Sequence, residues 1–342
     1  MNVVLGGTGL VGSHLLYELT SKGESVKALK RKGSDTKTVW HIFSYYSENP
    51  DSLFNRINWV EGDILDLISL EDVIDEGDLV YNCASMISFN SSHKYKIFKT
   101  NIYGTENIVN TCLYKKAGKL CHVSSISAIG DAPDGIPATE ELIWAPDKSN
   151  SYYTISKFHS EMEVWRGIEE GLEAVIINPS VIIGPGDWNK SSSKLFQAIH
   201  NGLVMHYPPG TTGYVDVRDV VKGMILLMES KISGERFILN EGNYSYKEIF
   251  QLIAKYVGRK KPLYELKYWV GKLAWRLDRI KSLILAKSPQ ITRETIEIGF
   301  KHLFYSNNKI KQKLNFEFLP VEKSIQDTAQ KFIEEIQKAR LS

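Results

Sequence analysis

The stretch VVLGGTGLVG, residues 3–12, decides the fold of this chain. A short apolar run leads into glycines at positions 6, 9 and 12, and an amphipathic helical pattern follows over residues 10–21. Glycine allows a tight turn and a close approach of the backbone to a phosphate, and the first turn of a helix offers free N–H groups. The context of these glycines therefore predicts a loop that binds the pyrophosphate of a dinucleotide.

Short apolar runs alternate with amphipathic stretches along the first two-thirds of the chain. The runs predict strands at 2–5, 25–29, 58–61, 79–82, 120–124, 174–178 and 236–239, and the stretches predict helices at 10–21, 70–74, 95–115, 152–170 and 219–230. This alternation predicts an α/β fold, a Rossmann-type doubly wound parallel sheet with helices on both faces. We expect residues 1–180 and 213–240 to form this NAD(P)-binding domain, and residues 181–212 and 241–342 to form a smaller, mostly helical substrate lobe.

Composition narrows the class of protein. The chain has 342 residues, of which 43% are hydrophobic and 24% charged, and its net charge of +2 argues against a nucleic-acid partner bound through bulk charge. Three cysteines without CxxC spacing read as free thiols, and the eight histidines show no metal-ligand spacing, so we predict no metal site. No signal peptide and no apolar run near the roughly 18 residues of a membrane span are visible, which predicts a cytoplasmic protein.

The end of the second predicted strand bears on the choice of dinucleotide. Lys30 and Arg31 stand where a NAD-preferring site usually has an acidic residue for the ribose 2′-hydroxyl. Two cations suit a 2′-phosphate, so we predict NADP(H), with NAD as the alternative. After the third strand, Asp63 is placed to reach the adenine amino group.

Two further segments carry groups suited to acid/base chemistry. Tyr153 and Lys157 are four residues apart on a predicted helix and so share one face. An ammonium beside a phenol stabilises the phenolate, and this spacing predicts a lowered pKa for Tyr153. A run of serines, Ser124, Ser125 and Ser127, ends the fifth strand, where a hydroxyl can hydrogen-bond a substrate oxygen.

The order of these motifs is more specific than any one of them. The glycine loop, GDI at 62–64, NCAS at 82–85, TNIYGT at 100–105, VSSISA at 123–128 and YTISK at 153–157 follow one another along the chain. This order resembles the extended short-chain dehydrogenase/reductase superfamily. Within it, the chain is similar to the NAD-dependent epimerase/dehydratase family, and more narrowly to its dihydroflavonol-reductase and 3β-hydroxysteroid-dehydrogenase-like branch. The resemblance covers roughly residues 1–240.

The resemblance implies roles for the matching positions. Tyr153 would be the general acid/base, Lys157 would hold the nicotinamide ribose, and Asn101 would steady Lys157 through water. Ser125 would orient the substrate oxygen, with Ser124 and Ser127 as alternatives. The resemblance also implies two sets of contacts: cofactor binding by Gly6, Thr8, Gly9, Leu10, Val11, Lys30, Arg31, Asp63, Ile64, Cys83, Ala84, Ser85, Tyr153, Lys157 and Pro179, and substrate binding by Met86, Ser125 and Asn178.

One departure from the family pattern bears on the substrate. Nucleotide-sugar epimerases commonly carry an arginine for the diphosphate at the position of Thr212. A sugar nucleotide would then lack a strong partner here, unless Lys190, Lys194 or Arg218 replaces it. We therefore expect an NAD(P)H-dependent oxidoreductase that interconverts a ketone and a secondary alcohol on a fairly apolar small molecule. A nucleotide-sugar epimerase or dehydratase is the alternative, and a non-catalytic dinucleotide sensor is a further one.

The stretch YWVGKLAWRLDRIKSLILAK, residues 268–287, has Trp and Leu at helical spacing with cations between them. We expect it to cover the substrate cleft, with association to a membrane surface as the alternative and no stable insertion. The resemblance also implies a homodimer formed through the helices at 95–115 and 152–170.

Overall fold

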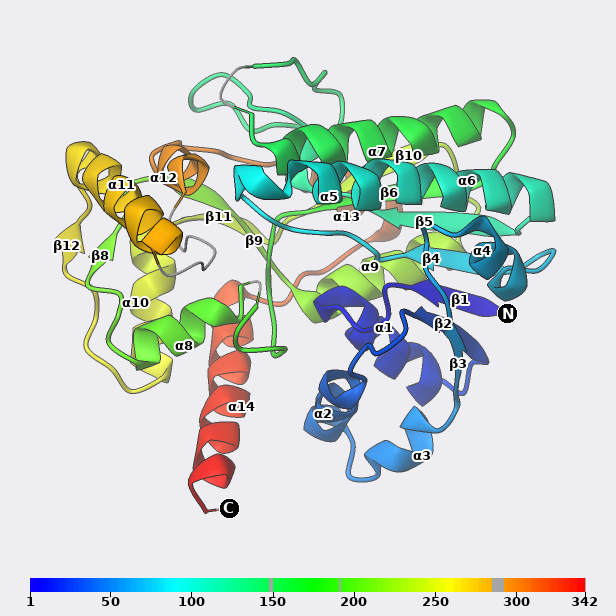
Figure 1. Ribbon diagram of the computed structural model, residues 1–342, viewed down its shortest axis with the longest axis horizontal. Coiled ribbons are helices and arrows are strands. Elements are labelled where there is room, and N and C mark those ends of the chain that lie inside the picture. Colours follow the sequence, from blue (N-terminus) through cyan, green and yellow to red (C-terminus); the bar gives the residue numbers. More distant parts are fainter. Residues whose placement is uncertain (148–149, 191, 285–291, 342) are drawn as a thin grey trace.

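A parallel sheet forms the centre of the molecule, in a computed structural model that describes residues 1–342 except 148–149, 191, 285–291 and 342. Its seven strands lie in the order β10-β6-β5-β4-β1-β2-β3 (Figure 1). Their bounds are β1 (Asn2–Leu5), β2 (Val26–Lys30), β3 (Ile57–Glu61), β4 (Leu79–Asn82), β5 (Lys119–Val123), β6 (Ala174–Pro179) and β10 (Glu235–Leu239). This confirms the predicted Rossmann-type fold, because every predicted strand lies within one residue of an observed one and all neighbours pair in parallel.

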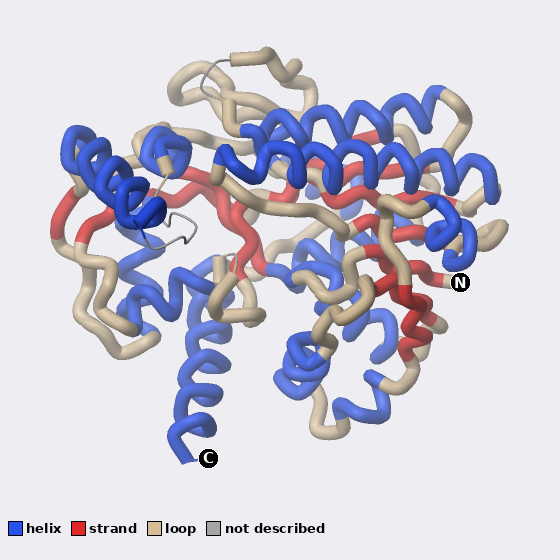
Figure 2. Tube along the Cα trace, viewed as in Figure 1, coloured by secondary structure: helices blue, strands red, loops and turns tan. Residues whose placement is uncertain are grey.

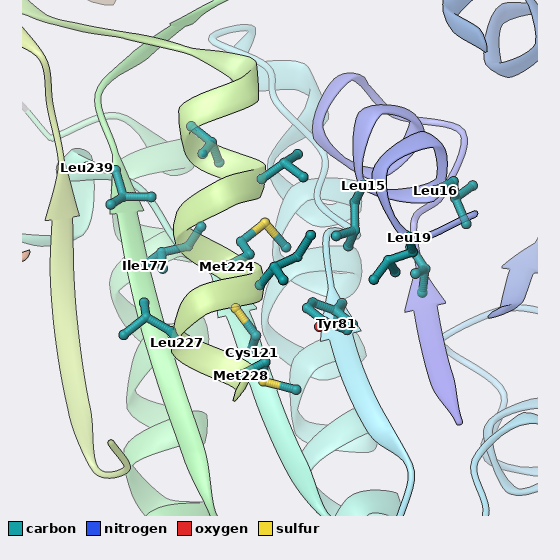
Figure 3. Close-up of a cluster of buried hydrophobic side chains, with 14 of the residues drawn as sticks. Leu15, Leu16, Leu19, Tyr81, Cys121, Ile177, Met224, Leu227, Met228 and Leu239 are labelled. Atoms are coloured by element: carbon teal, nitrogen blue, oxygen red, sulfur yellow. The ribbon is translucent and has the colours of Figure 1, made fainter. Parts of the chain in front are cut away.

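Helices cover both faces of this sheet (Figure 2). One face packs against α1 (Leu10–Ser21), α2 (Lys37–Tyr46) and α9 (Val217–Glu229), and the other against α4 (Leu67–Val73), α6 (Gly104–Lys115) and α7 (Tyr152–Glu169). Figure 3 shows the core on the face covered by α1 and α9, where Leu15 of α1 and Met224 of α9 point toward strand residues such as Tyr81 and Ile177. Strands buried on both sides explain why the sequence shows continuous apolar runs.

The structure corrects the predicted helices at three places. Two begin earlier than expected, because Asp66 caps α4 and Asp216 caps α9 through their carboxylates. The helix expected over 95–115 is instead three segments, α5 (Lys94–Phe98), a π-helical turn (Lys99–Tyr103) and α6. Such turns often lie at functional sites.

A smaller lobe lies beside the carboxyl ends of the strands (Figure 1). A three-stranded sheet, β11-β9-β7, joins it to the main sheet, and β12 pairs with β8. The strands are β7 (Val181–Ile183), β8 (His206–Tyr207), β9 (Thr211–Asp216), β11 (Gly242–Ser245) and β12 (Tyr264–Glu265). Its helices are α8 (Lys194–His200), α10 (Tyr246–Tyr256), α11 (Tyr268–Ile284), α12 (Arg293–Gly299) and α14 (Val321–Leu341).

Two shorter helices complete the chain. In the Rossmann part, α3 (Pro50–Phe54) follows α2, and near the C-terminus α13 (Asn308–Leu314) packs on β10 and adds Ile310 to the core of the main sheet. The stretch expected to cover the cleft forms α11 up to residue 284, and residues 285–287 lie outside the described part of the chain. Across the described residues, every helix is too short or too polar to cross a bilayer.

Candidate active site

The glycine loop sits where the strand order reverses, between β1 and β4. Gly6 has a φ of +81°, and a Cβ there would lie 2.6 Å from the backbone nitrogen of Ala84. A Cβ on Gly12 would lie 2.3 Å from the Gly6 carbonyl oxygen, so the loop, the start of α1 and the end of β4 meet as bare backbone. Parallel sheets bind ligands at this point, and the cradle fits the pyrophosphate of a dinucleotide.

The other predicted loop residues lie around this cradle. Thr8, Leu10 and Val11 are partly buried at the start of α1, and Gly9 is its N-cap. Cys83, Ala84 and Ser85 follow β4, the strand next to β1 in the sheet. Burial raises the pKa of the Cys83 thiol to about 12. A thiol that stays neutral near pH 7 is a poor nucleophile.

The predicted adenosine residues lie at the ends of β2 and β3. Lys30 is the last residue of β2, with its Nζ 6.0 Å from the centre of the Trp59 ring, and Arg31 follows it on the surface. Asp63 is the second residue after β3 and accepts a hydrogen bond from the backbone N–H of Leu65. Ile64 is buried against α6, where a Cβ on Gly104 would lie 2.6 Å from its Cδ1.

Helix α7 delivers Tyr153 and Lys157 to the end of β5. Ser151 caps the helix by accepting the Thr154 amide, which fixes the turn that carries Tyr153. Both side chains are buried, and the Lys157 ammonium donates to the Val123 carbonyl oxygen at 2.8 Å. The tyrosine, the lysine and the serine end of β5 are therefore held together next to the glycine loop.

The pKa of Tyr153 corrects one prediction. Burial raises it, and the group that lowers it is the hydrogen-bonded Ser125 hydroxyl and not Lys157. Burial also lowers the pKa of Lys157 to about 8, against the opposing charge of Glu161. The predicted depression by Lys157 is therefore wrong for this state: burial dominates the pKa of Tyr153, and the Lys157 ammonium donates to a backbone carbonyl.

Asn101 lies in the π-helical turn and joins two parts of the site. Its amide accepts the Met86 backbone N–H at 2.7 Å and donates to the Met86 carbonyl at 3.0 Å. The same Nδ2 donates to the Ser156 hydroxyl at 2.9 Å, and Ser85 donates to its Oδ1 at 3.3 Å. Asn101 thus clamps the loop after β4 onto α7, while its predicted action on Lys157 through water stays a prediction.

A buried ion pair behind the site is absent from the sequence predictions. Glu161 receives hydrogen bonds from Ser124 at 2.7 Å and Asn178 at 2.8 Å, and it pairs with Arg236 of β10 at 2.8 Å. Asn178 also donates to the backbone oxygen of Ser125 at 3.0 Å, so the network holds the strand ends that carry the serines. The signal available in the sequence is spacing, since Glu161 follows Lys157 by four residues.

Some predicted substrate contacts are only partly open to the site. Asn178 is fully buried, and Pro179 ends β6 beside it. Met86 is half-buried in the loop after β4, near Phe89, whose ring lies edge-on to Tyr153 at 5.8 Å between centroids. Phe89 gives the phenol an apolar neighbour, and sequence reasoning did not single it out.

In the described part of the chain, no group of three or more His, Cys, Asp and Glu side chains is placed to hold a metal ion. The site as described consists of the phenol, the ammonium, the serine hydroxyls and the backbone cradle.

Known proteins resemble this chain along most of its length. It is 28% identical over 340 residues to a putative dihydroflavonol 4-reductase of Synechocystis sp., covering 96% of this chain and 93% of that protein. It is 27% identical over 261 residues to sterol demethylase protein B of Methylococcus capsulatus, covering 76% and 75% of the two chains. The crystal structure of gox2253 superposes with a TM-score of 0.81 at 26% identity, over 98% of each chain.

The family assignment rests on the Rossmann part of the molecule. The model of the NAD dependent epimerase/dehydratase family matches residues 2–240, which include the glycine loop, the serines, Tyr153 and Lys157. The reductases among its relatives agree with the chemistry of this site. The chain therefore belongs to the NAD dependent epimerase/dehydratase family and is an NAD(P)-dependent oxidoreductase of the extended short-chain dehydrogenase/reductase type.

Proposed function

We propose that this enzyme interconverts a ketone and a secondary alcohol on a fairly apolar small molecule, with NADP(H) as its cofactor. The observation that carries the proposal is the buried Tyr153 phenol, hydrogen-bonded to Ser125 and one helical turn from Lys157. The reductase and sterol names of two relatives, together with the Phe89 ring against Tyr153, support an apolar substrate.

Each side chain has a defined task in this reaction. When bound, the nicotinamide supplies or takes up a hydride at the carbinol carbon. Ser125 hydrogen-bonds the substrate oxygen, and Tyr153 gives that oxygen its proton during reduction or takes it during oxidation. The raised pKa keeps Tyr153 protonated near neutral pH, so the resting site is ready for reduction. Lys157 holds the nicotinamide ribose.

Replacement of Tyr153→Phe tests this mechanism. The variant should lose about 10²–10⁴-fold in turnover of a ketone substrate, because phenylalanine has no hydroxyl to deliver the proton. It should bind NADPH as tightly as the parent. Tyr152→Phe is the matched control, since Tyr152 precedes it on α7 and stacks under Lys94. Undiminished turnover by Tyr153→Phe would remove the proposed role.

The preference for NADP(H) rests on Lys30 and Arg31 at the end of β2. Arg31→Ala should weaken NADPH binding by roughly 10–100-fold, the loss expected for a hydrogen bond to a charged group, and leave NADH binding unchanged. Lys22→Ala is the control, because Lys22 caps the C-terminus of α1, at the end of the helix away from the glycine loop. Calorimetric titration measures both, and equal affinity of the parent for the two dinucleotides would contradict the preference.

Calorimetric titration with UDP-sugars separates the reductase from a nucleotide-sugar epimerase. Thr212 is buried in β9, and two of the cations that could replace the missing arginine are engaged by carboxylates: Lys190 by Asp187, and Arg218 by Asp216. We therefore expect no binding of UDP-sugars. Clear UDP-sugar binding with NAD carried through purification would favour the epimerase.

We also propose a homodimer and a cytoplasmic location. Tyr95, Tyr103 and Tyr114 along the α5–α6 segment and Met162 on α7 are exposed, which supports a contact between copies across these helices. The free thiols of Cys83, Cys112 and Cys121 suit a reducing compartment. Sedimentation equilibrium of the purified protein tests the dimer.

A further inference from the structure

Helix α11 exposes a continuous apolar stripe. Trp269, Leu273, Leu277 and Ile280 are each between 49% and 65% exposed. Positions i, i+4, i+8 and i+11 lie on one side of a helix, so the four side chains form a single face. Soluble proteins seldom leave such a face uncovered without a partner.

The other side of α11 faces the lobe. Gly271 is buried, and a Cβ there would lie 3.0 Å from Ile296 of α12. Tyr268 and Trp275, on the same side of the helix as Gly271, line a pocket of about 240 Å³ with Ile296 of α12, and Lys272 and Arg276 reach its rim. The helix is therefore anchored by one side, and the apolar stripe points away from the packed side.

Cations border the stripe. Lys272, Arg276, Arg279 and Lys281 are exposed, and Asp278 is the one acidic residue of the helix. At 100° per residue, the first three lie along one edge of the stripe and Lys281 along the other. Long basic side chains of this kind keep their charge in a polar layer while their stems lie on apolar surface.

More exposed apolar side chains lie next to the start of the helix. Leu263 and Tyr264 precede it in the chain, and Leu203 and Met205 precede the strand that pairs with Tyr264. Figure 1 shows α11, β12 and β8 together at the outer rim of the molecule. The apolar surface therefore extends beyond the helix at the edge of the lobe.

We propose that α11 is an interfacial helix that docks this enzyme onto the surface of a bilayer containing anionic phospholipids. The stripe enters the boundary between headgroups and acyl chains, and the bordering cations meet the lipid phosphates and carboxylates. Trp269 has the apolar body and polar tip that suit this layer. The helix lies on the bilayer and does not cross it.

Charge decides between a bilayer and a second copy of the chain. A two-fold contact through this face would bring the cations of one α11 against those of the other, and like charges at an interface cost binding energy. An anionic bilayer neutralises all four. This proposal stands on α11 alone and is independent of the reaction at Tyr153.

Flotation of the full-length protein with vesicles tests the proposal. The parent should float with vesicles of phosphatidylcholine and phosphatidylserine, float less with phosphatidylcholine alone, and be released by salt. Trp269→Glu with Leu277→Glu should stay at the bottom of the gradient. Arg279→Glu with Lys281→Glu should lower the partition onto phosphatidylserine vesicles at least roughly 25-fold, at about fivefold for each cation lost.

Matched measurements keep the outcome clear. Ile143→Glu replaces an exposed apolar side chain that is not part of α11 and should float like the parent. Retained NADPH binding shows that each variant is folded. The proposal would be overturned if the parent protein did not float with either kind of vesicle. It would also be overturned if the α11 variants floated as well as the parent. Dissociation of a dimer by the α11 variants in sedimentation would assign the face to a second copy.

Discussion

Glu161 shows how much of this site depends on one buried carboxylate. It lies eight residues after Tyr153 and four after Lys157, on the same side of α7, and it bonds to Ser124, Asn178 and Arg236. Its charge raises the pKa of Lys157 against the effect of burial. One side chain therefore positions the strand ends and adjusts the charge of the lysine.

Glu161→Gln should act on both stability and pH dependence. Arg236 would be left buried without its counter-charge, which should lower the free energy of unfolding by about 3–5 kcal/mol. Lys157, without the carboxylate, should have a pKa below its present value of about 8. The ammonium would then deprotonate at lower pH, and the alkaline fall of activity should move to lower pH in the same direction.

Urea unfolding and the pH profile of kcat measure these two effects. Glu169→Gln changes an exposed carboxylate on the same helix and should alter neither. A destabilised variant whose activity falls at the same alkaline pH as that of the parent would mean that Glu161 only holds the strand ends together and does not adjust the charge of Lys157.

At this scale the sequence predicts local pairs and misses distant ones. Tyr153 and Lys157 are visible because a four-residue spacing on a helix is a local property. Arg236, the ion-pair partner of Glu161, is 75 residues away in the chain, and no local pattern in either segment predicts that the two meet. The raised pKa of Tyr153 also escapes a prediction from local spacing, because its main cause is burial, which tertiary packing sets.

Among the elements, the two turns that flank α1 offer a matched pair of glycines, Gly6 before the helix and Gly23 after it. Gly6 and Gly23 both have a φ of +81°, but a Cβ on Gly6 meets Ala84 at 2.6 Å while one on Gly23 meets nothing within 4 Å. Alanine at either position should cost about 1–2 kcal/mol of backbone strain. Gly6→Ala should in addition push β4 from the loop and abolish NADPH binding.

Thermal unfolding and calorimetric titration of the two variants separate strain from contact. Gly23→Ala should bind NADPH like the parent. Equal NADPH binding by both variants would show that the close approach of the loop to Ala84 has no bearing on the cofactor.

Element boundaries follow from how strong the local signal is. The strands were predicted within one residue because they are buried on both sides and read as apolar runs. The π-helical turn at Lys99–Tyr103 was not predicted, since one extra residue in a turn barely disturbs the apolar pattern of a long helix. That turn is what directs Asn101 toward Met86 and Ser156.

Across the whole molecule, Asp219 links the end of the chain to the main sheet. It lies on α9 and accepts the backbone N–H of Leu319 at 2.8 Å. Burial raises the pKa of this carboxyl to about 6, from an unfolded value near 3.8. The native state therefore holds its proton to higher pH than the unfolded chain, and stability falls as pH rises from about 4 to 6.

Asp219→Asn should remove this part of the pH dependence. Relative to the parent, the variant should gain up to about 3 kcal/mol of unfolding free energy between pH 4 and pH 7. Urea unfolding at both pH values measures the difference, and the exposed Asp134→Asn serves as control. A constant difference across the range would contradict the raised pKa.

The separation of 75 residues between Glu161 and Arg236 in the chain also means that the two are synthesised at different times. A ribosome adding about 5–20 residues per second needs roughly 4–15 seconds to pass from one to the other. Until β10 joins the edge of the sheet beside β6, the carboxylate of Glu161 lacks its ion-pair partner Arg236. A nascent chain that already holds Tyr153, Lys157 and the glycine loop therefore stays unfinished, and a message truncated before residue 236 yields no working enzyme.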